Sequence, residues 1–325
     1  MNDHAEQKAT ENADKRILIT GASGYVGGLL GQRLMSEYPV FGTDIRTRND
    51  LGFPVTVMDV RDPRLRALLV RERITHVVHL ASVLDTTGDR EKDYDIDVNG
   101  TRNVLDCCVR AGVQHLTVTS SGAAYGYHAD NPAWIDEEDA LRGNREFPYS
   151  DHKRRIESML AEARTHHPGL RQLIFRPGTI LGAHTQNLIT QLFARRALLA
   201  IKGSDSPFVF MWDQDVVDAM AYGIHESRSG IYNMAGDGAL TIHDIAAVLG
   251  KPVRVLPAGL LRSALWLGKL LRVGRYGPEQ VNFLRYRPVL SNRRLKEEFG
   301  YVPKKTSDET FRFYVEHARA RGDLS

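Results

Sequence analysis

The stretch from Lys15 to Gly28, KRILITGASGYVGG, constrains the fold of this chain more than any other part of its sequence. Its apolar run, Ile17-Leu18-Ile19, predicts a buried strand, and the apolar spacing from Val26 onward predicts a helix. The glycines between them allow a tight turn and a close approach of a ligand to the backbone. The first N–H groups of a helix lack intrahelical partners and carry partial positive charge, so this junction predicts an anion-binding site.

The glycines follow the spacing G-x-x-G-x-x-G, which by itself also fits an ordinary strand-to-helix turn. In a dinucleotide site, Gly21 would allow the turn, Gly24 would let a pyrophosphate approach, and Gly27 would let the helix pack closely. A second predicted strand, Val40–Asp44, supports this hypothesis because it ends in an acid where such folds bind the adenosine ribose.

The acid at this position also bears on the choice of cofactor. The carboxylate of Asp44 accepts hydrogen bonds from a ribose 2′-hydroxyl and repels a 2′-phosphate, so it favours NAD over NADP. Arg46 and Arg48 follow closely. Both are expected to be solvated loop charges, with binding of a 2′-phosphate as the alternative.

Strand and helix patterns alternate over the first 180 residues or so. The expected strands are 55–62, 74–82, 116–121 and 173–177, and the expected helices are 63–73, 94–112 and 149–164. Near-continuous apolar strands are typical of a parallel sheet covered on both faces. The pattern predicts an α/β protein with a doubly wound parallel sheet, whose ligands lie at the carboxyl ends of the strands.

The remaining sequence suggests a division into three parts. We expect a polar, disordered tail at 1–14, a dinucleotide-binding domain at 15–182, and a smaller substrate lobe at 183–325 that is partly interleaved with that domain. In the lobe, the expected elements are helices at 186–199, 215–226, 241–249 and 258–271 and a strand at 231–233.

Composition excludes several classes of function. A net charge of +3 gives no reason to expect a nucleic-acid partner. Cys107 and Cys108 are adjacent in an apolar helical pattern, which predicts reduced core residues of a cytoplasmic protein and no metal site. We find no secretion signal and no stretch of membrane-spanning length, so we expect no stable membrane insertion.

The candidate chemistry begins at Tyr149 and Lys153, which lie four residues apart and hence on one face of a predicted helix. A cation so close favours the phenolate, which makes Tyr149 a candidate general acid or base for a substrate hydroxyl. Ser121 closes a predicted strand of the same sheet, where its hydroxyl would orient the reacting oxygen. A non-catalytic nucleotide sensor would need none of these three residues, so their presence favours an enzyme.

These motifs occur in an order that resembles a known family, the extended short-chain dehydrogenase/reductases of the NAD-dependent epimerase/dehydratase group. The resemblance is strong over residues 15–182 and weak to about 305. Its motifs are TGASGYVG, Asp44, Asp59-Val60, HLAS at 79–82, NGT at 99–101, SSGAAYG at 120–126, Tyr149…Lys153 and RPG at 176–178. The resemblance implies a Rossmann-type fold, NAD as the cofactor and a homodimer formed by the helices at 94–112 and 149–164.

The resemblance also implies a role for each matched residue. Tyr149 would be the general base, Lys153 would support it and hold the nicotinamide ribose, and Ser121 would orient the substrate oxygen. The residues expected to bind the cofactor are Gly21, Ser23, Gly24, Tyr25, Val26, Gly27, Asp44, Ile45, Arg46, Asp59, Val60, Leu80, Ala81, Ser82, Asn99, Tyr149, Lys153 and Pro177. Asn99 is expected behind the lysine, with a helix N-cap as an equal alternative.

The substrate is less well defined. The resemblance implies a nucleotide sugar, with Ala123, Asn187 and Arg287 as candidate substrate residues. Phe208, however, stands where the family usually has an arginine for the substrate diphosphate, and an apolar ring cannot replace that anion clamp. Arg285 or Arg287 would compensate, although surface charge is the simpler interpretation. The alternative is a hydrophobic alcohol or ketone, as in the related 3β-hydroxysteroid dehydrogenases.

An apolar segment with scattered basic residues, Leu256–Leu271, is the second unusual feature of the lobe. Packing in the core of the lobe is the first interpretation of this segment. A lid over a hydrophobic substrate is the second, and a helix lying on a membrane surface is the third.

Overall fold

The computed structural model describes residues 14–83, 87–270 and 277–324, so the predicted tail lies outside the described residues except for Asp14. The chain forms two compact units, each made of three segments. The first unit comprises residues 1–120, 152–176 and 216–232, and the second comprises 121–151, 177–215 and 233–325. The division at residue 182 remains a prediction.

A seven-stranded sheet organises the first unit, in the order β10-β6-β5-β4-β1-β2-β3. Its strands are β1 (Ile17–Thr20), β2 (Val40–Asp44), β3 (Val55–Val57), β4 (His76–His79), β5 (His115–Thr119), β6 (Arg171–Pro177) and β10 (Gly230–Met234). The pairings of β1 with β2 and with β4 are parallel, and they set Thr20 level with Thr43 and with His79. The carboxyl ends of these strands therefore share one edge of the sheet, and the predicted doubly wound parallel sheet is confirmed.

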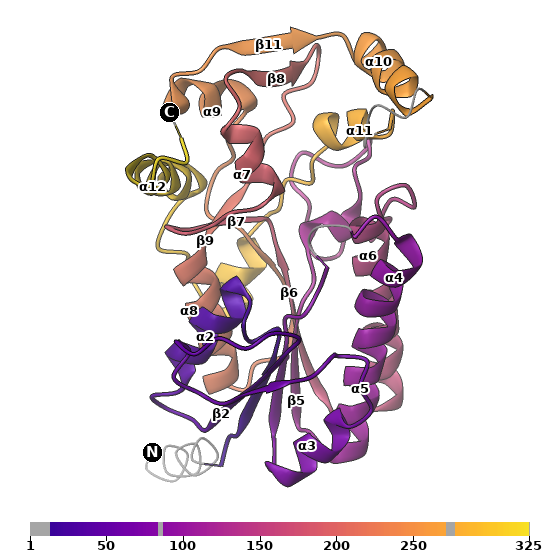
Figure 1. The fold of residues 1–325 in the computed structure, drawn as a ribbon, viewed down its shortest axis with the longest axis vertical. Helices are drawn as coiled ribbons and strands as arrows, with labels where there is room; N and C mark the ends of the chain where they lie inside the picture. Colours follow the sequence, from indigo (N-terminus) through magenta and orange to yellow (C-terminus); the bar gives the residue numbers. More distant parts are fainter. Residues whose placement is uncertain (1–13, 84–86, 271–276, 325) are drawn as a thin grey trace. The chain divides into compact units, whose positions relative to one another are not determined.

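Helices cover both faces of this sheet (Figure 1), with α3, α5 and α6 along one face and α2 and α8 along the other. Their bounds are α2 (Tyr25–Leu34), α3 (Leu65–Arg71), α4 (Arg90–Tyr94), α5 (Gly100–Ala111), α6 (Pro148–His166) and α8 (Asp213–His225). A π-helical turn, Asp95–Asn99, joins α4 to α5. The expected helix at 94–112 therefore starts earlier and changes its winding at its N-terminal end.

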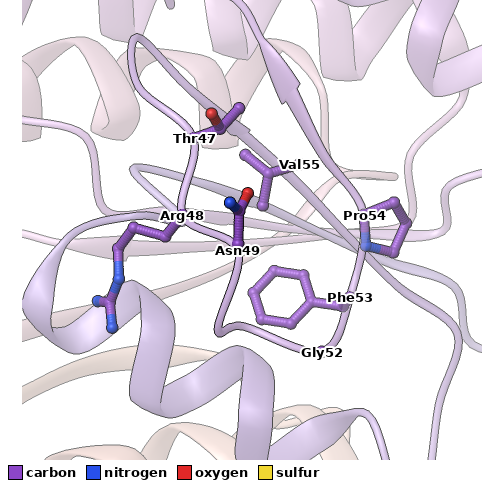
Figure 2. Close-up of a pocket in the computed structure, with 7 residues that line it drawn as sticks. All are labelled: Thr47, Arg48, Asn49, Gly52, Phe53, Pro54 and Val55. Atoms are coloured by element: carbon purple, nitrogen blue, oxygen red, sulfur yellow. The ribbon is translucent and has the colours of Figure 1, made fainter.

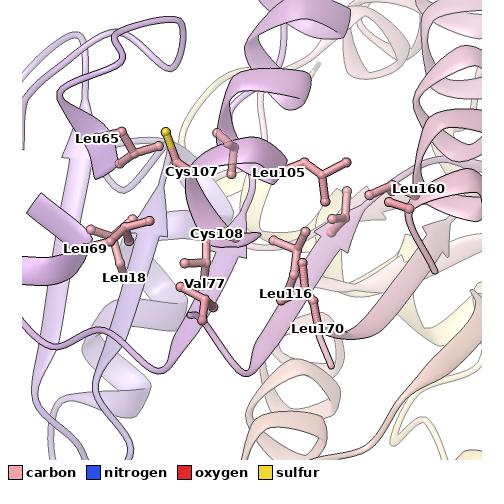
Figure 3. Close-up of a cluster of buried hydrophobic side chains, with 14 of the residues drawn as sticks. Leu18, Leu65, Leu69, Val77, Leu105, Cys107, Cys108, Leu116, Leu160 and Leu170 are labelled. Atoms are coloured by element: carbon pink, nitrogen blue, oxygen red, sulfur yellow. The ribbon is translucent and has the colours of Figure 1, made fainter. Parts of the chain in front are cut away.

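Apolar side chains from four strands and three helices fill the space on the α3–α5–α6 side of the sheet (Figure 3). Leu18, Val77 and Leu116 come from the middle of the sheet and are at most 1% exposed. Cys107 and Cys108 of α5 lie in this core as free, buried thiols. This packing holds the strand ends rigidly in place.

The second unit is built on short strands and its own aromatic core. Its elements are β7 (Thr179–Leu181), β8 (Leu198–Ile201), β9 (Phe210–Trp212), β11 (Val253–Leu256), α7 (Leu188–Phe193), α9 (Ile242–Leu249), α10 (Ala258–Leu270), α11 (Gln280–Arg285) and α12 (Ser307–Ala320), with a π-helical turn at Leu295–Phe299. Phe193, Phe210 and Phe311 are fully buried and pack ring against ring at centroid distances of 5.2 to 6.2 Å. They form the centre of this unit.

One predicted helix of the lobe is wrong in its second half. The sequence suggests a helix at 186–199, but α7 ends at Phe193 and residues 198–201 form β8. β8 pairs in parallel with β11, with Leu198 opposite Val253. Short apolar runs such as this one fit either state, and pairing with a strand 55 residues later in the sequence decides between them.

Candidate active site

The glycine turn after β1 has no room for side chains where the sequence predicts an anion site. Gly21 has a φ of +71°, which glycine adopts without strain, and a β-carbon there would lie 2.8 Å from the nitrogen of Ala81. A β-carbon on Gly27 would lie 2.2 Å from the carbonyl oxygen of Gly21. The turn therefore forms the close backbone cradle that a pyrophosphate requires.

The end of α2 above this turn is electropositive. Gly24 is its N-cap residue and contributes no side chain to cap the first N–H groups, and the first turn carries no acidic residue. Serine, threonine or aspartate would ordinarily satisfy one of these donors. A helix end of this kind favours an anionic ligand.

The carboxylate of Asp44 lies beside the glycine turn. Its Oδ2 accepts a hydrogen bond from the backbone N–H of Ser23 at 3.0 Å, and its Oδ1 accepts one from the N–H of Arg46 at 3.1 Å. Arg48 is held by a bidentate contact with Asp50, with donor–acceptor distances of 3.0 and 2.6 Å. Asp44 forms no ion pair with a described residue, so its charge remains available to ribose hydroxyls.

Asp59 and Val60, two of the residues expected to bind the cofactor, are positioned by different contacts. Asp59 makes a bidentate ion pair with Arg61, and this arginine lowers the pKa of the Asp59 carboxyl despite the opposing effect of burial. Val60 packs closely against Gly100: a β-carbon on Gly100 would lie 2.7 Å from the Cγ2 of Val60. Asp59 is thus a fixed polar group, and Val60 is a fixed apolar one.

Helix α6 carries both members of the predicted tyrosine–lysine pair in its first two turns. Lys153 is 5% exposed, and its Nζ donates a hydrogen bond to the carbonyl oxygen of Thr119, at the end of β5, at 3.0 Å. Tyr149 is half-buried one turn before it on the same helix. Helical spacing places the two side chains on one face, as the sequence predicts.

A buried polar network fixes α6 at this point. His152 shares a hydrogen bond with Asp97 at 2.9 Å, and Ser82 donates to the other oxygen of the same carboxylate at 3.0 Å. Burial acts to raise the pKa of Asp97, but the contacts with His152, Lys153 and Ser82 outweigh it and hold that pKa below its ordinary value. The charge of Asp97 therefore balances the buried ammonium of Lys153.

Asp97, and not Asn99, is thus the buried polar residue that interacts with Lys153, which corrects the expectation for Asn99. The side chain of Asn99 is exposed and donates to Asp95 at 2.9 Å. It makes no side-chain cap, because the helical winding runs through this position from α4 into α5. The buried polar side chain at this place is that of Asp97, two residues before Asn99.

A second ion pair, not singled out from the sequence, anchors α6 to the sheet. Glu157 accepts from Arg176 of β6 at 2.6 Å, and both side chains are at most 4% exposed. Glu157 also accepts from Ser120, the residue before Ser121. Sequence spacing gives no signal for these contacts, because the partners lie in distant segments.

In the second unit, Ser121 begins a short 3₁₀ turn, Gly122–Tyr125. Its Oγ accepts from the N–H of Ala123 at 3.1 Å, and Ser150 donates to the carbonyl oxygen of Ala123 at 2.6 Å. Ser150 is the neighbour of Tyr149, so this bond ties the segment of Ser121 to the start of α6. Pro177 is buried at the end of β6.

Arg287 lies against aromatic rings, so the interpretation of this residue as a surface charge is wrong. Its guanidinium carbon is 3.9 Å from the ring centroid of Phe208, the residue that replaces the expected arginine, and 5.4 Å from that of Phe283. Its Nη1 donates to Ser206, while its buried Nε has no hydrogen-bond partner in the structure. Arg287 forms no ion pair with a described residue, and burial lowers its pKa to about 10.

Tyr127, which sequence reasoning missed, lies in the same cluster. Its ring is 5.0 Å from that of Phe283 and 5.3 Å from that of Phe147. Burial raises the pKa of Tyr127, the charge of Tyr149 raises it further, and Arg287 opposes both. Tyr127 therefore lies within electrostatic reach of both Tyr149 and Arg287. The only sequence signal is its place directly after the Tyr125-Gly126 motif.

Asn187 has a structural use that the sequence did not predict. Its Oδ1 accepts from the N–H groups of Ile189 and Thr190 at 2.9 Å, and Thr190 completes a capping box. This cap fixes the start of α7. Any contact with a substrate would fall to the Nδ2 of Asn187.

A shallow pocket of about 460 Å³ lies beside the loop after Asp44 (Figure 2). The ring of Phe53 lines it, together with the side chains of Asn49 and Pro54. Its one ionisable lining residue is Arg48, which is paired with Asp50. This pocket offers no acid or base and is separate from the chemistry of α6. No cluster of metal-ligating side chains occurs among the described residues.

The strand order, the glycine cradle and the acid at the end of β2 define a dinucleotide-binding fold of the Rossmann type. A model of the NAD dependent epimerase/dehydratase family matches residues 17–235, and the chain belongs to this family. It is therefore an NAD-dependent enzyme, as predicted, and the family resemblance found in the sequence is confirmed.

Three relatives illustrate the family. An uncharacterized protein of Mycobacterium tuberculosis H37Rv is 24% identical over 95% of this chain and 84% of its own length. N-acetyl-alpha-D-glucosaminyl-diphospho-ditrans,octacis-undecaprenol 4-epimerase of Escherichia coli O157:H7 is 26% identical, covering 71% of this chain and 70% of its own. The structure of Thermus thermophilus UDP-glucose 4-epimerase with NAD is 25% identical, with a TM-score of 0.70 over 94% and 99% of the two chains.

Proposed function

We propose that this enzyme oxidises a secondary alcohol of a nucleotide sugar, with Tyr149 as the general base, in an epimerase or dehydratase reaction. The relatives support the substrate class, since the Thermus epimerase is named for UDP-glucose and the Escherichia epimerase for a sugar diphosphate. The glycine cradle at Gly21 and Gly27, the uncapped end of α2 and the free charge of Asp44 all fit NAD.

NAD, when bound, supplies the acceptor for the hydride that leaves the alcohol carbon. In our proposal the phenolic oxygen of Tyr149 takes the hydroxyl proton of the substrate. Lys153, whose Nζ is fixed by the carbonyl oxygen of Thr119, would stabilise the phenolate and help to hold the nicotinamide ribose. The hydroxyl of Ser121 orients the reacting oxygen, so each group has a single task.

The observation that carries the substrate class is the environment of Arg287. A half-buried guanidinium with an unpartnered Nε and no described carboxylate partner is costly unless an anion completes it. A diphosphate offers paired oxygens that match the planar fork of arginine. Phe208 supports the guanidinium of Arg287 through a cation–π contact. In our proposal Arg287 thus binds the diphosphate in place of the arginine that the family usually has at the position of Phe208.

The experiment is a comparison of Arg287→Gln with wild type on a panel of nucleotide sugars. We expect the KM to rise roughly tenfold to a hundredfold, because a charge-assisted contact with the diphosphate is lost. Affinity for NAD should stay unchanged. Arg293→Gln is the matched control, since Arg293 is exposed and paired with Asp136. An unchanged KM in Arg287→Gln, with turnover intact, would remove the diphosphate assignment.

One observation favours a second candidate, the oxidation of a hydrophobic alcohol. The rings of Tyr127, Phe147 and Phe283 form an apolar wall beside Arg287. Turnover of an uncharged sterol-type alcohol by wild type and by Arg287→Gln at equal rates would support this candidate over the nucleotide sugar. Retention of NAD through gel filtration would add support for an epimerase, which keeps its cofactor through a full redox cycle.

A further inference from the structure

Helix α10 exposes an apolar surface that no other described part of the chain covers. Leu260, Trp266 and Leu267 are 60%, 57% and 49% exposed, and no residue from 258 to 267 is buried. The first interpretation of this segment, packing in the core of the lobe, is therefore wrong. Exposed apolar clusters of this kind mark interaction surfaces.

The exposed residues occupy a defined side of the helix. Leu260, Ala264 and Leu267 follow the i, i+4, i+7 spacing of one face. The exposed side of the helix is broader than this face: Trp266 lies about 100° round the helix from Leu267, and Arg262 lies at the edge of the exposed side. Leu261 and Leu265, on the remaining side, are only half-exposed. Val255 of β11, the strand just before α10, is also 51% exposed. Arg254, the residue before Val255, is exposed as well, and it lies on the opposite face of the strand because successive side chains of a strand alternate.

The segment of sequence that contains β11 and α10 carries only positive charges. Between Ile245 and Leu270 the sequence has no acidic residue, and its basic residues are Lys251, Arg254, Arg262 and Lys269. Arg254 and Arg262 are exposed and form no ion pair with a described residue. A second copy of this chain packed about a two-fold axis would bring such cations together, which disfavours that occupant.

We propose that α10, assisted by the positive charge of Arg254 in the preceding strand, docks the enzyme on an anionic lipid surface. Leucines would enter the boundary between headgroups and acyl chains, Trp266 would lie at the headgroup level, and the two arginines would face lipid phosphates. Among the described residues, no helix has the length and apolar character needed to cross a bilayer. The attachment is thus peripheral, and it does not depend on which alcohol the enzyme oxidises.

The first experiment is co-sedimentation of the full-length protein with vesicles of phosphatidylcholine, with and without phosphatidylglycerol. We expect binding to the anionic vesicles, weakened by salt, and a blue shift of tryptophan fluorescence that Trp266→Phe abolishes. The double variant Leu260→Asp/Leu267→Asp should lose at least about tenfold in partitioning, because two apolar side chains no longer enter the lipid. Val302→Asp is the control, since Val302 is 65% exposed outside this surface.

The charges are tested separately. Arg254→Gln/Arg262→Gln should weaken binding by about fivefold for each arginine. Arg102→Gln/Arg110→Gln removes the same charge from exposed sites on α5 and should leave binding unchanged. Circular dichroism and sedimentation velocity establish that each variant is folded and report its oligomeric state.

Three results would overturn the proposal. The first is the absence of wild-type binding to either kind of vesicle. The second is equal vesicle binding by wild type and Leu260→Asp/Leu267→Asp. The third is dissociation of an oligomer in that variant without any vesicle binding, which would identify a second copy of the chain as the occupant.

Discussion

Gly27 faces the carbonyl oxygen of Gly21 so closely that the position excludes any side chain. Gly27→Ala should destabilise the protein by about 1–3 kcal/mol and abolish NAD binding, because α2 must move away from the turn. Thermal unfolding and an NAD titration measure the two effects. Gly169→Ala is the matched control, since a β-carbon there would meet no atom within 4 Å. Normal NAD affinity in Gly27→Ala would contradict the assignment of the turn.

Residues whose placement in the fold depends on local spacing could be predicted from the sequence. The glycine turn, Asp44 and the Tyr149–Lys153 pair all follow from the order of residues within one strand–turn–helix unit or one helix. The aromatic setting of Arg287 could not be predicted, because it arises from Phe208, which is far away in sequence. In the sequence, Phe208 could be recognised only as a departure from the family pattern.

At the scale of elements, the strands β4 and β5 contain histidines that lie buried in the sheet. His76 stacks on His115 at 5.2 Å, and burial, aided by the charges of His115, Lys15 and Arg171, lowers the pKa of His76 to about 3. The ordinary pKa of a histidine is near 6.5. As the pH falls below that value, His76 therefore binds a proton in the unfolded chain but stays neutral in the folded chain. His76 therefore costs no stability well above pH 6.5, and its effect lowers the free energy of unfolding as the pH falls from about 6.5 toward 3.

This difference gives a prediction for pH dependence. His76→Phe should reduce the loss of unfolding free energy between pH 7 and pH 5 by about 1–2 kcal/mol, because one of the protons taken up on unfolding is removed. Urea unfolding at the two pH values measures it. His167→Phe is the control, since His167 is exposed beyond α6. An unchanged difference in His76→Phe would show that this histidine does not titrate as described.

The elements that sequence reasoning missed depend on long-range pairing or on caps. β8 and β7 are strands of three or four residues that exist through partners later in the chain. α12 was missed, although Thr306 and Glu309 form a capping box at its start, a signal that the sequence does carry. The π-helical turn before α5 has no sequence pattern that marks it.

At the scale of the whole molecule, the homodimer remains a prediction. α5 and α6 lie on the same face of the sheet (Figure 1), and Ser158 and Ala161 are exposed on α6. Ser158→Arg/Ala161→Arg should convert a dimer into a monomer in sedimentation velocity at micromolar concentration. Ala194→Arg, at an exposed site in the second unit, should leave the dimer intact. A monomeric wild type would exclude this assembly.

The central claim is that Tyr149 carries the proton in an NAD-dependent oxidation, and one variant tests it most directly. Tyr149→Phe keeps the ring but removes the hydroxyl. We expect kcat on the best nucleotide sugar to fall by about 10²- to 10⁴-fold while the Kd for NAD stays within a factor of about two. Tyr222→Phe, which alters a tyrosine of α8, should retain full turnover. A Tyr149→Phe enzyme with near-wild-type kcat would contradict the account.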